Sequence, residues 1–147
     1  MVRGAVARRV ALENAALAAA YALMGTLSLL TVRETGLAAP VWPAAGIALA
    51  AVLVLGWRVA PGVAVGSLLV NIPAVLSDER GTVIALGVPL MIAIGGALQA
   101  MTGAGLVRRF VGARPPLVDA ASIIRFLVLA GPVACLVAPR VGLMAQL

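Results

Sequence analysis

Residues 41–71 read VWPAAGIALAAVLVLGWRVAPGVAVGSLLVN, and this stretch decides the fold of the chain. Two apolar runs flank a short Gly56-Trp57-Arg58 turn, and each run opens with a cluster that contains proline and glycine. The second run ends at Asn71, a polar residue in hydrophobic surroundings. Long apolar runs joined by so short a turn predict two consecutive helices of a polytopic membrane protein.

The composition of the whole chain supports the same fold class. Of its 147 residues, 63% are hydrophobic and 11% are charged, whereas soluble domains have about 45–50% apolar and about 25% charged residues. A soluble domain of this size could not hide so much apolar surface. With about 20 residues per span, we expect an all-α polytopic transmembrane helix bundle of about five spans. It would form a single integral membrane domain over residues 1–147, without a soluble domain.

Five apolar segments are the predicted spans, and short connections separate them. They cover about Val10–Thr31, Ala38–Leu55, Val59–Leu76, Val83–Val107 and Ser122 to the end of the chain. A cleaved signal peptide is the alternative for the first segment, since a basic start precedes it. Because further spans follow at once, we favour a retained first helix.

The arginines predict the orientation of these spans. An inside N-terminus places seven of them on the cytoplasmic side, with Arg125 close to it, and leaves two in outer loops beside acidic residues. The seven are Arg3, Arg8, Arg9, Arg58, Arg108, Arg109 and Arg114, and the two are Arg33 and Arg80. We therefore expect a multi-pass protein of the cell inner membrane with a cytoplasmic N-terminus.

Several kinds of chemistry have no residues to support them. The chain has no His and a single cysteine, Cys135, so it lacks a phosphoacceptor histidine, a His-based metal site and an internal disulfide. No nucleophile–base pair, carboxylate dyad or phosphate-binding glycine loop stands out. We expect no catalytic residues, cofactor or metal, and we attribute the net charge of +6 to membrane topology rather than to nucleic-acid binding.

Polar residues inside the apolar segments are costly and need a reason. Asn71 and Gln99 lie at different depths, so we expect each to hydrogen-bond between helices rather than to the other, with ligand contact as the alternative. Glu13 follows Arg9 by one helical turn, which predicts an i,i+4 ion pair. Arg140 has no evident acidic partner, and we expect the last helix to end near Ala138. The alternatives are an arginine that faces the bundle interior or snorkels.

Glycine, proline and tryptophan positions predict packing and helix ends. Gly62 and Gly66 have the GxxxG spacing, which allows close helix–helix approach. Pro43 and Pro61 fall near helix starts, and Pro73 and Pro89 are expected to kink their helices. Trp42 and Trp57 lie at opposite ends of the second segment, as expected for interfacial anchors.

The segment from Trp42 to Ala50, the Gly56-Trp57-Arg58-Val59-Ala60-Pro61-Gly62 turn and the run from Gly66 to Asn71 resemble a bacterial sensory family. This family is the first type of membrane-associated sensor domain, the MASE-type domain. The segment Ala130–Val137 is also similar to its fifth-helix region. The resemblance implies an inner-membrane input module of about eight helices, of which this chain would be the first half.

In such a module, the resemblance implies a cytoplasmic output domain, either a histidine kinase or a cyclic-di-GMP enzyme, as the partner in the full-length protein. A homodimer within the lipid bilayer is a further arrangement that the sequence leaves open. The chain departs from the family's pattern in two ways. Arg140 stands where the family has an apolar or small residue, and the family's later helices are missing. The candidate signalling and packing positions are Trp42, Pro43, Gly46, Arg58, Pro61, Gly62, Gly66, Asn71 and Gln99.

Two other functions compete with sensory input. A transporter or channel fragment would line a path with Asn71, Gln99 and the glycine-rich fourth segment. Against it, no carboxylate lies deep in a span and no half-repeat is detectable. A scaffold bundle is the third alternative. Solute flux in liposomes distinguishes the transporter from the other two.

Overall fold

A computed structural model describes residues 2–35, 42–76, 82–110, 124 and 128. Four α-helices and one short 3₁₀ turn make up the described part, in which no strand occurs. The elements are α1 (Val2–Thr35), α2 (Pro43–Leu55), η1 (Trp57–Val59), α3 (Ala60–Leu76) and α4 (Thr82–Phe110). The all-helical prediction is therefore confirmed for this part of the chain.

The helix lengths differ from the predicted spans. α1 begins eight residues before Val10 and has 34 residues, which is about 51 Å at 1.5 Å per residue. α2 has 13 residues, or about 20 Å, which is less than the roughly 30 Å of a hydrocarbon core. Its predicted start at Ala38 lies outside the described residues. Two helical stretches, Arg3–Leu30 and Leu86–Phe110, are long and apolar enough to cross a membrane.

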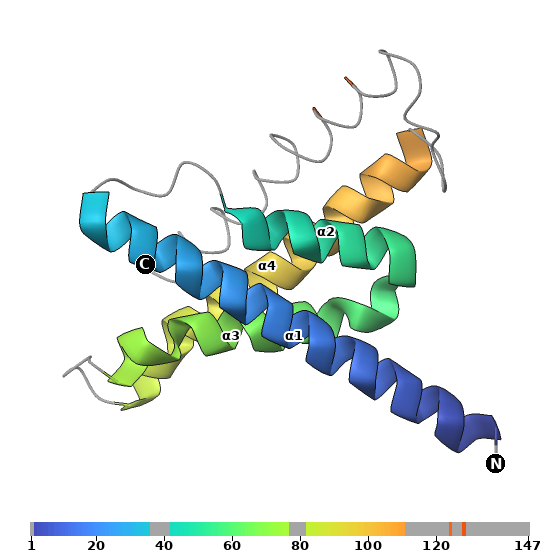
Figure 1. The fold of residues 1–147 in the computed structure, drawn as a ribbon, viewed down its shortest axis with the longest axis horizontal. Helices are drawn as coiled ribbons and strands as arrows, with labels where there is room; N and C mark the ends of the chain where they lie inside the picture. The colour runs from blue at the N-terminus through green and yellow to red at the C-terminus, as the bar shows by residue number, and fades with distance from the viewer. Residues whose placement is uncertain (1, 36–41, 77–81, 111–123, 125–127, 129–147) are drawn as a thin grey trace.

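The helices alternate in direction along the chain. α1 packs against α2 and α3, and α4 packs against the same two helices from the opposite side. In Figure 1, α1 and α3 run one way while α2 and α4 run the other way. The N-terminal half of α1, the α2–α3 turn and the C-terminal end of α4 therefore lie at one end of the bundle.

Local sequence explains where α2 begins and ends. Pro43 occupies its first turn, where a missing N–H is harmless and the fixed φ of proline suits a helix. Gly56 ends it with φ +88° and ψ 179°, a conformation that side chains disfavour. The Gly56 N–H still donates to Val52 O at 3.0 Å, and η1 then turns the chain into α3. Pro73 and Pro89 lie inside α3 and α4, which continue beyond them.

The residue distribution is inverted relative to a soluble protein. Small residues fill the interior, including Ala44, Ala48, Ala100 and Ala104, each at most 4% exposed. Large aliphatic side chains cover the outside, among them Leu12, Leu23, Leu90 and Val54, the last 82% exposed. Water would penalise such a surface, whereas lipid does not, and lipid favours small residues between helices. The bundle is therefore built for a membrane.

Candidate functional site: the α1–α3 seam and the α2–α3 turn

Three glycines bring the backbones of α1 and α3 together. A Cβ atom on Gly62 would stand 2.7 Å from Asn14 O, and one on Gly66 would stand 2.9 Å from Ala18 O. From the other helix, a Cβ on Gly25 would stand 2.7 Å from Val70 Cγ2. Real Cβ atoms do not approach other atoms so closely, so these positions admit only glycine without a shift. We call this contact the α1–α3 seam.

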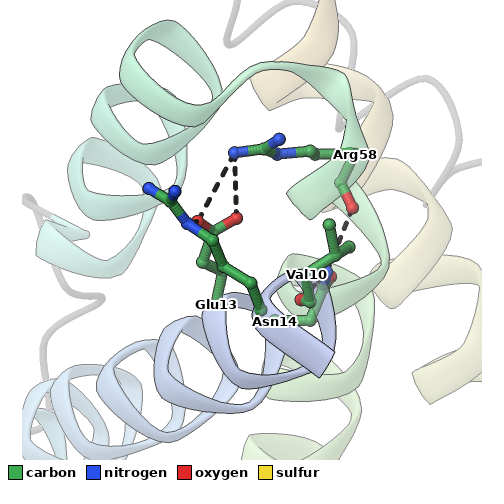
Figure 2. A network of polar contacts seen from close by, with 5 residues as sticks. Val10, Glu13, Asn14 and Arg58 are labelled. Atoms are coloured by element: carbon green, nitrogen blue, oxygen red, sulfur yellow. Dashed lines mark hydrogen bonds and ion pairs between the residues drawn. The ribbon is translucent and has the colours of Figure 1, made fainter. Parts of the chain in front are cut away.

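Asn14 joins the seam to the start of α3. Its Oδ1 accepts a hydrogen bond from the Gly62 N–H at 2.7 Å. Its Nδ2 donates to Arg58 O at 3.1 Å, as Figure 2 shows. Nδ2 also donates to Val10 O within α1 at 2.9 Å. The first N–H groups of a helix lack partners within it. A side chain of α1 therefore caps α3, the role that a local N-cap residue usually fills.

Glu13 forms a charged link beside this cap. Its carboxylate pairs with Arg9 at 3.0 Å and with Arg58 at 3.1 Å, so it joins α1 to the α2–α3 turn. The Glu13 side chain is 14% exposed, whereas those of Arg9 and Arg58 are 77% and 46% exposed. Pairs with exposed partners contribute about 0–1 kcal/mol each. This link therefore orients the turn more than it stabilises the fold.

A tyrosine lies further along α1, toward the other end of the bundle. Tyr21 is buried, and the indole Nε1 of Trp42 donates to its hydroxyl at 3.4 Å. A Cβ on Gly96 of α4 would stand 3.6 Å from that hydroxyl and 3.9 Å from Ser67 Oγ of α3. Tyr21 therefore reaches a point where all four helices come close.

Arg108 connects α4 to the end of α2. Its Nη2 donates to Val52 O at 2.8 Å and to Leu53 O at 2.9 Å. Val52 O also accepts from the Gly56 N–H, whereas Leu53 O is one of the last carbonyls, which lack donors within the helix. A cation is favourable at this negative end of the helix dipole. Arg108 thus satisfies the C-terminal end of α2.

The seam and the turn contain only part of the predicted site. Arg58, Gly62 and Gly66 come together against α1, which confirms the close packing expected from the GxxxG spacing. Pro43 begins α2 as expected, Pro61 is exposed in the first turn of α3, and Gln99 is half-buried in α4. Gly46 is exposed, and a Cβ there would meet nothing within 4 Å. Among the described residues Gly46 therefore makes no close contact, and its role stays a prediction.

Three other interpretations are corrected or extended by the structure. Asn71 donates to Ser67 O at 2.8 Å, within α3, rather than to another helix, because one turn along a helix brings that carbonyl within reach. Trp42 is half-buried and donates its indole N–H to Tyr21, a contact that the anchor interpretation did not include, whereas Trp57 is 55% exposed. The interfacial position of both tryptophans stays a prediction. The Arg9–Glu13 pair is confirmed, but Glu13 also binds Arg58, whose expected role was topological.

Sequence reasoning missed Asn14, Tyr21, Gly25 and Arg108. An asparagine that interrupts an apolar run near its start could have suggested a capping role, but not which helix it caps. Gly25 is one of several small residues spaced along α1, and such a spacing could have indicated a helix-packing face. The predicted fifth span from Ser122, Cys135 and Arg140 lie outside the described residues, apart from Ile124 and Val128.

The described residues contain no group of three or more His, Cys, Asp or Glu side chains that could hold a metal ion. The α1–α3 seam, the Asn14 cap and the Glu13 ion pairs all fix the position of α1 against α3 and the α2–α3 turn. The role that this geometry supports is therefore mechanical.

Comparison with known families identifies the family of the chain. The MASE1 family model matches residues 13–147. The chain belongs to the MASE1 family. The expected resemblance is therefore confirmed. MASE1 domains are membrane sensory domains, and this chain is a domain of that type. No curated protein and no solved structure matches the chain.

The MASE1 match begins at Glu13, which is the residue that pairs with Arg58. The motif residues Arg58, Gly62 and Gly66 all lie on the side of α3 and its preceding turn that faces α1. In this MASE1 domain, the family-like segment is therefore a helix-packing element.

Proposed function

We propose that this MASE1 domain is the sensory input part of a bacterial signal-transduction protein. It would lie in the cell inner membrane as a multi-pass bundle with a cytoplasmic N-terminus, as part of a larger membrane module. Its output would be a cytoplasmic histidine kinase or a cyclic-di-GMP enzyme. The observation that carries this proposal is that the motif residues converge on a helix–helix contact.

The seam suits a switch because it admits few intermediate arrangements. Backbones that meet through glycine cannot slide without losing van der Waals contact, so packed helices favour discrete positions over continuous deformation. A stimulus that favours one arrangement of α1 against α3 would shift the population between states. The Glu13–Arg58 link would set the position of the α2–α3 turn in one of them.

The test measures output from the complete protein with Arg58→Gln, alongside Arg58→Lys. Arg58→Gln removes the charge that pairs with Glu13 but keeps the backbone carbonyl that Asn14 binds, so insertion should be normal. We expect altered kinase or cyclase output with Arg58→Gln and partial retention with Arg58→Lys. Val65→Ala, on the outward face of α3, is the control and should behave as the wild type.

Unchanged output from Arg58→Gln, at a normal level in the membrane, would remove the turn from the signalling pathway. A complete protein with no catalytic output domain would overturn the proposal more broadly.

A further inference from the structure

The end of the bundle that holds the α2–α3 turn concentrates positive charge. The Asn14–Gly62 and Arg108–Val52 hydrogen bonds place the N-terminal half of α1, the turn and the last residues of α4 at this end. Arg3, Arg8, Arg9, Arg58 and Arg109 are all exposed there. We call this surface the basic end.

Among the described residues, little of its positive charge is compensated. Glu13 is the carboxylate that the structure describes at this end, and Arg9 and Arg58 already share it. Within the described residues, Arg3, Arg8 and Arg109 form no ion pair, and Arg109 lies 5.9 Å from the centre of the Phe110 ring. On the described residues, Arg3, Arg8 and Arg109 are therefore available to bind anions.

Apolar side chains surround these arginines. Val6, Leu12, Val54, Trp57 and Phe110 are between 54% and 82% exposed at the same end. A soluble anion or a nucleic acid would leave these side chains in water, whereas the boundary between headgroups and acyl chains accommodates both kinds of residue. α1 also continues for about three turns before Asn14, so its arginines extend beyond the turn.

We propose that the basic end binds anionic phospholipid headgroups, with the phosphates held by the exposed arginines of α1 and the α2–α3 turn. Basic residues beside membrane helices recognise anionic headgroups through charge, at a contribution equivalent to about fivefold in local lipid preference per arginine. The proposal holds for either orientation of the bundle, and so does not depend on the proposed sensory role.

The chain carries its own reporters for this proposal, because its two tryptophans lie at opposite ends of α2. Trp57 is next to Arg58 at the basic end, and Trp42 is at the other end. Trp42→Phe and Trp57→Phe give two single-tryptophan proteins. Each is reconstituted in phosphatidylcholine vesicles that contain brominated phosphatidylglycerol or, separately, the same fraction of brominated phosphatidylcholine.

We expect brominated phosphatidylglycerol to quench Trp57 several-fold more effectively than brominated phosphatidylcholine, and to show no such preference at Trp42. Raising the salt concentration should reduce the preference, because charges are screened within about 10 Å at 0.1 M ionic strength. Arg8→Gln/Arg9→Gln, at exposed positions of α1, should also reduce it while leaving helicity unchanged.

Equal quenching of Trp57 by the two lipids would overturn the proposal. A preference of the same size at Trp42 would also overturn it, since the charge would then not be local. A preference that survives Arg8→Gln/Arg9→Gln in full would contradict the role given to α1.

Discussion

The α1–α3 contact and the α2–α4 contact are built differently. In the seam, Gly25, Gly62 and Gly66 bring the two helices so close that a methyl group at any of them would stand within 3 Å of the other helix. In α4, a methyl group on Gly105 would have nothing within 4 Å, and Gly46 of α2 is exposed. The α2–α4 pair instead contributes alanine and valine side chains to the core. One contact has no spare room, and the other is held by ordinary packing and by Arg108.

The largest expected effect comes from filling the seam. Gly66→Ala places a methyl group 2.8 Å from Tyr21 Cβ, and overpacking of this kind should lower the free energy of unfolding by about 2 kcal/mol. Gly46→Ala is the matched control and should change it by less than about 1 kcal/mol, in the stabilising direction. Unfolding by SDS titration in mixed micelles, followed by circular dichroism, measures both. Equal effects would show that the seam is no tighter than the outside of α2.

Asn14 tests whether the seam is also held by its polar cap. Asn14→Ala removes the acceptor for Gly62 N–H and the donor to Arg58 O, and should cost about 1–1.5 kcal/mol. Asn71→Ala loses one bond inside its own helix and should change the free energy of unfolding by less than about 0.5 kcal/mol. The same titration compares the two. A larger loss for Asn71→Ala would contradict the capping role.

The sequence allowed the packing face of α3 to be predicted, because small residues four apart have few uses in a membrane helix other than close approach. It could not identify the face of α1, where the matching residues are Asn14, Ala18 and Gly25. Those residues look unremarkable in an alanine-rich run. The partner of a polar residue depends on tertiary contacts, and for this reason the sequence predicts the wrong partner for Asn71 and only one of the two partners of Glu13. The exact helix ends also depend on caps that distant residues supply.

Arg108 tests what holds the contact between α2 and α4. Arg108→Gln removes the charged donor to Val52 O and Leu53 O, and should cost about 1 kcal/mol. Faster amide exchange confined to the last turn of α2 should accompany the loss, as measured by hydrogen–deuterium exchange mass spectrometry. Arg109→Gln is the control, because its described contact is with the adjacent Phe110 ring, and it should cost at most about 0.5 kcal/mol. Exchange that rises across all helices in Arg108→Gln would instead indicate a general loss of packing.

The most direct test of the seam is cysteine cross-linking in native membranes, in a Cys135→Ala background. A Cβ on Gly25 would stand 2.7 Å from Val70 Cγ2, close to where a cysteine at position 70 would place its sulfur. Gly25→Cys/Val70→Cys should therefore form an intramolecular disulfide rapidly with a mild oxidant. Leu23→Cys/Leu69→Cys, on outward-facing positions of the same helices, should not. Efficient cross-linking of the 23/69 pair with none at 25/70 would contradict the parallel, glycine-mediated contact of α1 and α3.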